Sequence, residues 1–276
     1  MRRCRPLLGT FVEIDADDHA AIDAAFVAVE QVHRLMSAHQ ADSELSQINR
    51  FAHLRPVTVS RCTAEVIGRA LYWSRVSGGT FDVARAGRLA IERGGLPLHY
   101  DQPSPIPSSN WKTVGIADGA VTLGRPACLD LGGIAKGFAV DQAITALREA
   151  GARSGLVNAG GDMRGFGRKP WAVAVPHPLT GHTVATIDLT DFALATSAGL
   201  IANGDALSFD HLPGVERTWI SVTVRAANAC GADALTKIVW ANPADLAEIL
   251  SDASADAFAI RRNGGIHAVG PEDLAA

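Results

Sequence analysis

The spacing of hydrophobic residues predicts helices in the first third of the chain. Residues 20–36 carry an apolar stripe at helical intervals, as in an amphipathic helix. The stripe consists of Ile22, Phe26, Val29 and Met36. Residues 37–50 begin as a loop and become a short helix, for which Asp42 or Ser43 is the expected N-cap. A single strand, over residues 9–15, is expected ahead of these helices.

A third helix is expected from Thr63, as its cap, to about residue 76, because the following Ser77-Gly78-Gly79 is typical of a helix stop. Residues 94–110 then contain four prolines and two glycines. Such a stretch is expected to be a surface loop or a connection between subdomains. The chain is therefore predicted to be a single domain over residues 1–276, with two subdomains joined near 94–110 as an alternative.

Strands dominate the rest of the chain. Residues 111–116 and 120–123 flank an Asp118-Gly119 turn, which predicts a hairpin. Further strands are expected at 127–131, 155–158, 171–175, 183–189, 192–196 and 219–224. Helices are expected between Gly133 and a stop at Gly151, with Val140, Ile144 and Leu147 on one stripe, and at 233–240 and 243–250, and a closing hairpin is expected around 263–265. Helices first and antiparallel strands later favour an α+β fold, with mixed or antiparallel sheets flanked by helices, over regular βαβ winding.

Composition narrows the class of protein. The 276 residues are 47% hydrophobic and 20% charged, with a net charge of −4, which argues against a nucleic-acid-binding protein. No apolar run approaches the roughly 20 residues needed to cross a bilayer. The four cysteines form no CxxC pair, and the basic start lacks the apolar core of a signal peptide. We therefore expect reduced thiols and a cytoplasmic protein.

One stretch, residues 128–151, carries the pattern of an anion site. Asp130 ends an apolar run, Gly132 and Gly133 allow a turn, and Lys136 falls in the first turn of the helix that follows. Glycines let backbone N–H groups approach phosphate oxygens, and the helix N-terminus adds partial positive charge. An ordinary strand-to-helix turn with a solvated lysine explains this stretch alone equally well.

Two further segments contain candidate site residues. Gly160 and Gly161 turn the chain before Asp162, without the GxGxxG spacing of a dinucleotide-binding turn. Taken alone, this is more typical of a tight turn than of a ligand site. Asp233 is expected at a helix start, where an acid is usually a capping residue. Small residues at 195–200 could admit a ligand or form a plain loop.

Taken together, these segments resemble the ApbE family, the FAD:protein FMN transferases. The matching segments are LLGTFVEI (7–14), MSAHQADSELSQIN (36–49), SGGTFDV (77–83), LDLGGIAKGFAVD (129–141), VNAGGD (157–162) and, more weakly, ADAL (232–235). The resemblance implies an enzyme that binds FAD with Mg and moves FMN to a Thr or Ser hydroxyl of an acceptor protein, releasing AMP. Phosphoryl transfer of this kind depends on positioning and charge neutralisation.

The resemblance also implies roles for individual residues. Leu8 stands where the family has a methionine that contacts the flavin, and His39 stands where the family has an aromatic residue that contacts the flavin. The other implied FAD contacts are Thr80, Phe81, Asp82, Asp130, Lys136, Gly160 and Gly161. For the metal, the resemblance implies the Gly133 carbonyl, the Asp233 carboxylate and the Thr236 hydroxyl.

Two departures from the family pattern fall in the catalytic half. Lys237 stands where the family has a metal-binding threonine, with Thr236 one place earlier. Lys237 must swing away, pair with Asp233 or replace the ion, and the last option would make it a fixed cation against the pyrophosphate. The segment 208–217 is shorter than in the family, so His211 is either the candidate base or a loop histidine. A metal-independent or catalytically impaired FAD-binding protein and an FAD pyrophosphatase are the alternatives to the transferase.

Overall fold

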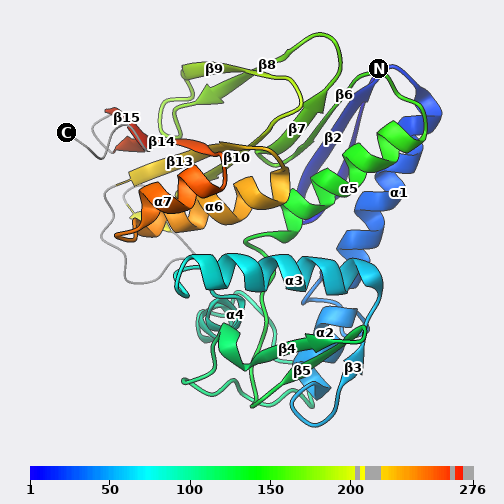
Figure 1. The fold of residues 1–276 in the computed structure, drawn as a ribbon, viewed down its shortest axis with the longest axis vertical. Helices are drawn as coiled ribbons and strands as arrows, with labels where there is room; N and C mark the ends of the chain where they lie inside the picture. The colour runs from blue at the N-terminus through cyan, green and yellow to red at the C-terminus, as the bar shows by residue number, and fades with distance from the viewer. Residues whose placement is uncertain (203–205, 209–218, 262–264, 270–276) are drawn as a thin grey trace. The chain divides into compact units, whose positions relative to one another are not determined.

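The computed structural model describes residues 1–202, 206–208, 219–261 and 265–269, which divide into two compact units (Figure 1). Unit 1 contains Met1–Glu30 and the described residues from Lys136 onward. Unit 2 contains Gln31–Ala135. The proline-rich stretch 94–110 therefore lies inside unit 2, and the chain passes between the units in helix α1 (His19–Met36) and again at the start of helix α5 (Ala135–Glu149).

Unit 1 is built on an eight-stranded antiparallel sheet with strand order β1-β2-β6-β7-β10-β13-β14-β15. The strands are β1 (Arg2–Leu7), β2 (Thr10–Ala16), β6 (Gly155–Ala159), β7 (Asp162–Phe166), β10 (Ala193–Ala198), β13 (Trp219–Ala226), β14 (Asp256–Arg261) and β15 (Ile266–Val269). A separate short hairpin pairs β11 (Leu200–Ala202) with β12 (Ala206–Ser208). The α+β class is confirmed, and so are the strands predicted at 155–158, 171–175, 183–189, 192–196 and 219–224.

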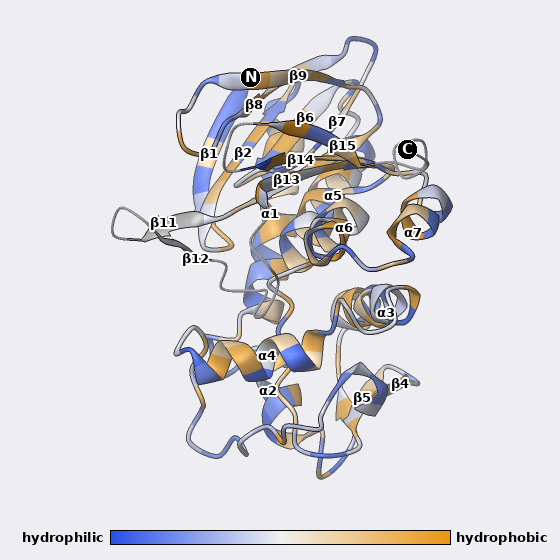
Figure 2. Ribbon diagram, turned by 90° about the vertical axis from the view of Figure 1, so that its left-hand side faces the viewer, coloured by the Kyte–Doolittle hydropathy of each residue, from blue (hydrophilic) through white to orange (hydrophobic). Residues whose placement is uncertain are grey.

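The two faces of this sheet are covered differently (Figure 1). Helix α6 (Ala229–Ala241) packs on β7, β10 and β13, with α5 and α7 (Leu246–Asp252) on the same side. A hairpin of β8 (Trp171–Pro176) and β9 (Thr183–Leu189) covers the other face, with Val173, Val175 and Leu189 packed against Leu194. Figure 2 colours the ribbon by hydropathy, and hydrophobic segments occur in helices of both units, α1, α4, α5 and α6 among them.

Helix α6 begins four residues before the predicted start. Asn228 is its N-cap and accepts a hydrogen bond from the Gly231 N–H at 2.8 Å, so Asp233 lies within the helix and is not its cap. The prediction failed because α6 is buried on all sides from Ala229 to Trp240 and shows no apolar stripe at its start.

Besides the end of α1, unit 2 combines four helical segments with a three-stranded sheet of order β3-β5-β4. Its elements are α2 (Glu44–Phe51), β3 (Val57–Thr58), α3 (Arg61–Val76), α4 (Val83–Glu92), a 3-10 turn (Trp111–Thr113), β4 (Val114–Ala117) and β5 (Ala120–Leu123). Of the two predicted candidates, Ser43 caps α2, and its side chain accepts from the Ser46 N–H at 3.0 Å. Ser60, rather than Thr63, caps α3.

The predicted strand at 127–131 is wrong. The segment joins no sheet, and the backbone of Leu129 is paired with the side chain of Asn49, whose Oδ1 accepts from Leu129 N–H at 2.7 Å and whose Nδ2 donates to Leu129 O at 3.1 Å. The Asp130 N–H donates to Val83 O at the start of α4 at 2.9 Å. A buried amide and a helix end thus satisfy the backbone groups that a neighbouring strand would otherwise pair.

Candidate active site

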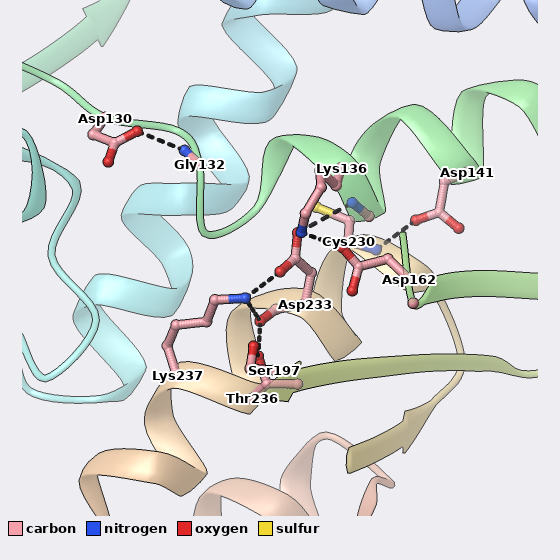
Figure 3. A network of polar contacts seen from close by, with 12 residues as sticks. Asp130, Gly132, Lys136, Asp141, Asp162, Ser197, Cys230, Asp233, Thr236 and Lys237 are labelled. Atoms are coloured by element: carbon pink, nitrogen blue, oxygen red, sulfur yellow. Dashed lines mark hydrogen bonds and ion pairs between the residues drawn. The ribbon is translucent and has the colours of Figure 1, made fainter. Parts of the chain in front are cut away.

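The charged residues of three matched motifs meet in one buried cluster of unit 1 (Figure 3). Lys136 lies in the first turn of α5, and Asp162 is the first residue of β7. Asp233 and Lys237 lie one turn apart on α6. Residues at i and i+4 share a helix face, so α6 directs both side chains to the same place. We call these four residues the charge cluster.

The contacts within the charge cluster join each carboxylate to an ammonium group. Lys136 Nζ lies 2.5 Å from Asp162 Oδ2 and 3.7 Å from Asp233 Oδ2. Lys237 Nζ forms an ion pair with Asp233 Oδ1 and donates to the backbone carbonyl of Asp233 at 3.1 Å. The Gly137 N–H donates to Asp233 Oδ2 at 3.1 Å. Both oxygens of Asp233 are therefore engaged by donors.

Burial gives these charges unusual titration behaviour. Asp233 is fully buried and Asp162 is 1% exposed. Burial and the neighbouring charge of Asp233 raise the pKa of Asp162 to about 6. Burial opposes ionisation of Asp233 too, but attraction to Lys136 and Lys237 outweighs it and lowers the pKa of Asp233. Burial also disfavours the charged form of Lys136, yet the two carboxylates raise its pKa.

Asp141 of α5 holds the start of α6 beside the charge cluster. Its Oδ1 accepts from the Ala229 N–H at 3.0 Å and its Oδ2 from the Cys230 N–H at 2.9 Å. Arg164 Nη1 pairs with Asp141 Oδ1 at 2.7 Å. A carboxylate at a helix N-terminus satisfies otherwise unpaired N–H groups and interacts favourably with the helix dipole. Asp141 thus ties α6 to α5.

Asp141→Ala should lower the free energy of unfolding by about 1–3 kcal/mol, because two helix N–H groups and Arg164 lose their acceptor. Urea unfolding measures this change. The matched control is Asp188→Ala on β9, at an exposed position, where we expect a change within about 0.5 kcal/mol. Equal effects of the two substitutions would contradict the role of Asp141.

The second glycine turn lies next to the charge cluster along the chain. Gly160 and Gly161 have positive φ angles of 63° and 100° between β6 and β7. A Cβ on Gly160 would lie 2.5 Å from Thr10 Oγ1 on β2, and the Gly161 N–H donates to Asn158 Oδ1 at 3.0 Å. Glycine is required here by backbone conformation and by the approach of β2. The turn places Asp162, the first residue of β7, in the charge cluster.

Unit 2 brings two of the predicted flavin segments together. Asp82 caps α4, accepting from the N–H groups of Ala84 and Arg85 at 3.0 Å each. Asp130 lies beside the same helix end through its bond to Val83, and its Oδ1 accepts from the Gly132 N–H at 2.7 Å. Burial raises the pKa of Asp82, against hydrogen bonds that lower it.

The other predicted site residues are distributed over both units. Phe81 is buried and Thr80 half-buried, directly before the α4 cap. His39 is exposed in the turn before α2, and Gly133 lies three residues before Lys136. Leu8 lies at the turn between β1 and β2 with a positive φ of 56°. His211 lies outside the described residues. The roles of all these residues stay predictions.

Sequence reasoning assigned no role to three residues that take part in the charge cluster or hold its surroundings in place. They are Asp162, which pairs with Lys136, Asp141, which holds α6, and Ser197, whose Oγ lies 2.8 Å from Thr236 Oγ1. A charged residue directly after the Gly160-Gly161 turn was the available signal for Asp162. Ser197 lies in the small-residue segment 195–200, where a ligand role and a plain loop had equal support.

The charge cluster does not have the donor set of a magnesium site. Thr236 Oγ1 donates to the backbone carbonyl of Asp233 at 2.7 Å. The Asp233 carboxylate already accepts from Lys237 and Gly137 and forms a longer ion pair, at 3.7 Å, with Lys136. Within the described ranges, no three His, Cys, Asp or Glu side chains gather as metal ligands. A dication about 4 Å from the Lys237 ammonium would be repelled by about 8 kcal/mol at an effective dielectric constant near 20.

Solved structures define the class of protein to which this fold belongs. An ApbE protein from Thermotoga maritima superposes with a TM-score of 0.82 at 24% identity, covering 97% of this chain and 96% of that one. The flavin transferase ApbE from Vibrio cholerae gives a TM-score of 0.80 at 22% identity, covering 98% and 96%. The fold is that of the ApbE proteins. The model of the ApbE family matches residues 8–260, and the chain belongs to this family.

The curated relatives of this chain are named for the same activity. The FAD:protein FMN transferase of Treponema pallidum is 27% identical over 227 residues, which are 71% of this chain and 62% of that protein. The FAD:protein FMN transferase of Haemophilus influenzae is 27% identical over 257 residues, covering 83% and 73%. The chain thus spans less than two thirds of the Treponema protein. In the described residues, no helix has the length and apolarity to cross a membrane.

Proposed function

We propose that this protein is an FAD:protein FMN transferase that moves FMN from FAD to a Thr or Ser hydroxyl of an acceptor protein and releases AMP. The acceptor oxygen attacks the phosphorus atom on the FMN side of the pyrophosphate and forms a new phosphoester bond. The bond from that phosphorus to the AMP oxygen breaks, and AMP leaves with the electron pair. The hydroxyl proton passes to a base, for which His211 is the candidate.

One observation carries the proposal. The motifs around Lys136, Asp162 and Asp233 are distant in the chain, yet their charged side chains meet within ion-pair distance in unit 1. Lys136 is also in the first turn of α5, where the helix dipole favours an anion. Phosphoryl transfer needs fixed positive charge at the pyrophosphate rather than covalent chemistry by the protein. Lys136 and Lys237 place two such charges in a largely buried setting, each held by a paired carboxylate.

The residues take the following proposed roles. Lys136 and the Gly160-Gly161 turn contact the FAD phosphates, as does Asp130 through its turn. Leu8, His39 and the segment from Thr80 to Asp82 contact the flavin. The family resemblance adds a magnesium ion on Gly133, Asp233 and Thr236, and this is the part of the proposal that the contacts of Asp233 oppose.

The transferase is tested by incubating the protein with FAD and a flavin-acceptor domain that carries a target Thr or Ser. We expect a fluorescent acceptor band and one AMP released for each FMN attached. AMP and free FMN with an unlabelled acceptor would instead indicate an FAD pyrophosphatase. FAD binding without AMP release would indicate a catalytically impaired binding protein. Either result would contradict the transferase.

FAD affinity should rise as the pH falls through about 6, because burial and the charge of Asp233 raise the pKa of Asp162 to about 6. Above this pH the two carboxylates of the charge cluster balance its two ammonium groups, and protonation of Asp162 leaves one net positive charge near the pyrophosphate. We expect affinity to increase about threefold or more between about pH 7.5 and about pH 5, by flavin fluorescence titration. Asp162→Asn should remove this dependence, and an unchanged or falling wild-type affinity would contradict it.

A further inference from the structure

Lys237 occupies a buried position in the interior-facing helix α6. The residue is 8% exposed and its partner Asp233 is fully buried. A lysine is seldom buried unless its charge is paired, and here the pair closes over one helical turn. Lys237 Nζ contacts both Oδ1 and the backbone carbonyl of Asp233. These are two hard oxygen atoms of the kind that a divalent cation would take.

The charges of the cluster balance without a metal ion. Asp162 and Asp233 contribute two negative charges, and Lys136 and Lys237 contribute two positive ones. A divalent cation added beside Lys237 would bring net positive charge into a buried site, so it could bind at Asp233 only by displacing an ammonium group. Lys237 is covalently tethered one turn from Asp233, which gives it a high effective concentration there.

We propose that the Lys237 ammonium takes the place of a divalent cation, so that the protein binds the pyrophosphate of FAD without a metal ion. This inference rests on the proposed function, because it assumes that the charge cluster faces FAD. Lys237 Nζ has three N–H donors, and Asp233 uses two of them. The third donor is the group that contacts a phosphate oxygen. Lys136 supplies the second fixed positive charge.

The test compares FAD binding by the wild-type protein in excess EDTA and in saturating MgCl2. We expect dissociation constants that agree within about twofold. Lys237→Thr should bind FAD at least about tenfold more weakly in EDTA and regain affinity with magnesium, because the variant frees Asp233 for a cation. The matched control is Lys169→Thr, at an exposed position of unit 1, which should behave as wild type.

The outcomes separate the inference from the proposed function. Wild-type binding that weakens about tenfold or more in EDTA overturns the inference and leaves the transferase proposal intact. No FAD binding under either condition overturns both. Manganese binding, followed by electron paramagnetic resonance without flavin, gives a second readout. We expect manganese to bind the Lys237→Thr variant but not the wild-type protein. If the wild-type protein binds manganese and the variant binds it equally well, the inference is overturned, even if the variant binds no FAD.

Discussion

Lys136→Gln should lower the free energy of unfolding of unit 1 by about 2–3 kcal/mol, as measured by urea unfolding at about pH 7.5. Asp162 is 1% exposed, and the substitution removes the ammonium group that lies 2.5 Å from its carboxylate. This loss is at the lower end of the range for breaking a buried ion pair, because the Lys136 side chain is 29% exposed and Asp162 can take up a proton. Unchanged stability would contradict the structural role of this pair.

A double variant separates stability from function. Lys136→Gln with Asp162→Asn removes both charges and should recover most of the lost stability, because no unpaired carboxylate stays buried at β7. FAD binding should stay weak in the double variant, since Lys136 is proposed as a phosphate contact. Recovery of both stability and FAD affinity would show that Lys136 acts only through Asp162.

The stability loss in Lys136→Gln should also depend on pH. Without Lys136, the pKa of Asp162 in the folded state rises above its present value of about 6. An acid whose pKa is raised by folding binds more protons in the folded than in the unfolded state, so stability increases as the pH falls. The difference from wild type should therefore shrink between about pH 7.5 and about pH 5.

Gly137→Ala should also destabilise the protein severely. A Cβ at this position would lie 2.1 Å from the backbone oxygen of Ala229 and 2.8 Å from Asp233 Cβ, so α5 and α6 would have to separate. We expect a loss of about 3 kcal/mol or more in the free energy of unfolding, beyond the usual cost of overpacking because the main obstacle is backbone. FAD affinity should fall with it, because the Gly137 N–H would move away from Asp233.

Gly68→Ala provides the matched control for Gly137→Ala. Gly68 lies inside α3, and a Cβ there would meet no atom within 4 Å. Alanine is a better helix former than glycine, so this variant should be stabilised by up to about 1 kcal/mol. Urea unfolding of the two variants should therefore give changes of opposite sign. If Gly137→Ala and Gly68→Ala lowered the free energy of unfolding by the same amount, the close packing of α5 against α6 would be contradicted.

Local signals in the sequence were sufficient for several elements. The cap at Ser43, one of two predicted candidates, and the Asp118-Gly119 hairpin depend on side chains and backbone angles within a few residues of each other. Both are observed, although residues 111–113 form a 3-10 turn instead of the start of the first hairpin strand. The first-turn position of Lys136 is also confirmed, because a glycine pair and an apolar periodicity mark the start of α5. The possible pairing of Lys237 with Asp233 follows from helix geometry alone.

Tertiary contacts determine what the sequence could not indicate. Helix α4 was not predicted, since Gly87 weakens its helical pattern, yet that glycine is required where a Cβ would lie 2.1 Å from Cys128 O. The contact between Lys136 and Asp162 joins residues from α5 and β7, and no local rule brings them together. Strand β1 was also missed. Its three arginines suggest a polar, solvent-exposed end, but the Arg3 and Arg5 guanidinium groups pack over the Phe26 ring.

The central claim is that the protein transfers FMN, and intact-mass spectrometry of the acceptor tests it most directly. After incubation of the wild-type protein with FAD and an acceptor domain in excess EDTA or MgCl2, the account predicts that the acceptor gains the mass of one FMN less one water. Substitution of the acceptor's target Thr or Ser by Ala should abolish the gain. An acceptor of unchanged mass under both conditions, with FAD bound to the protein, would contradict the account.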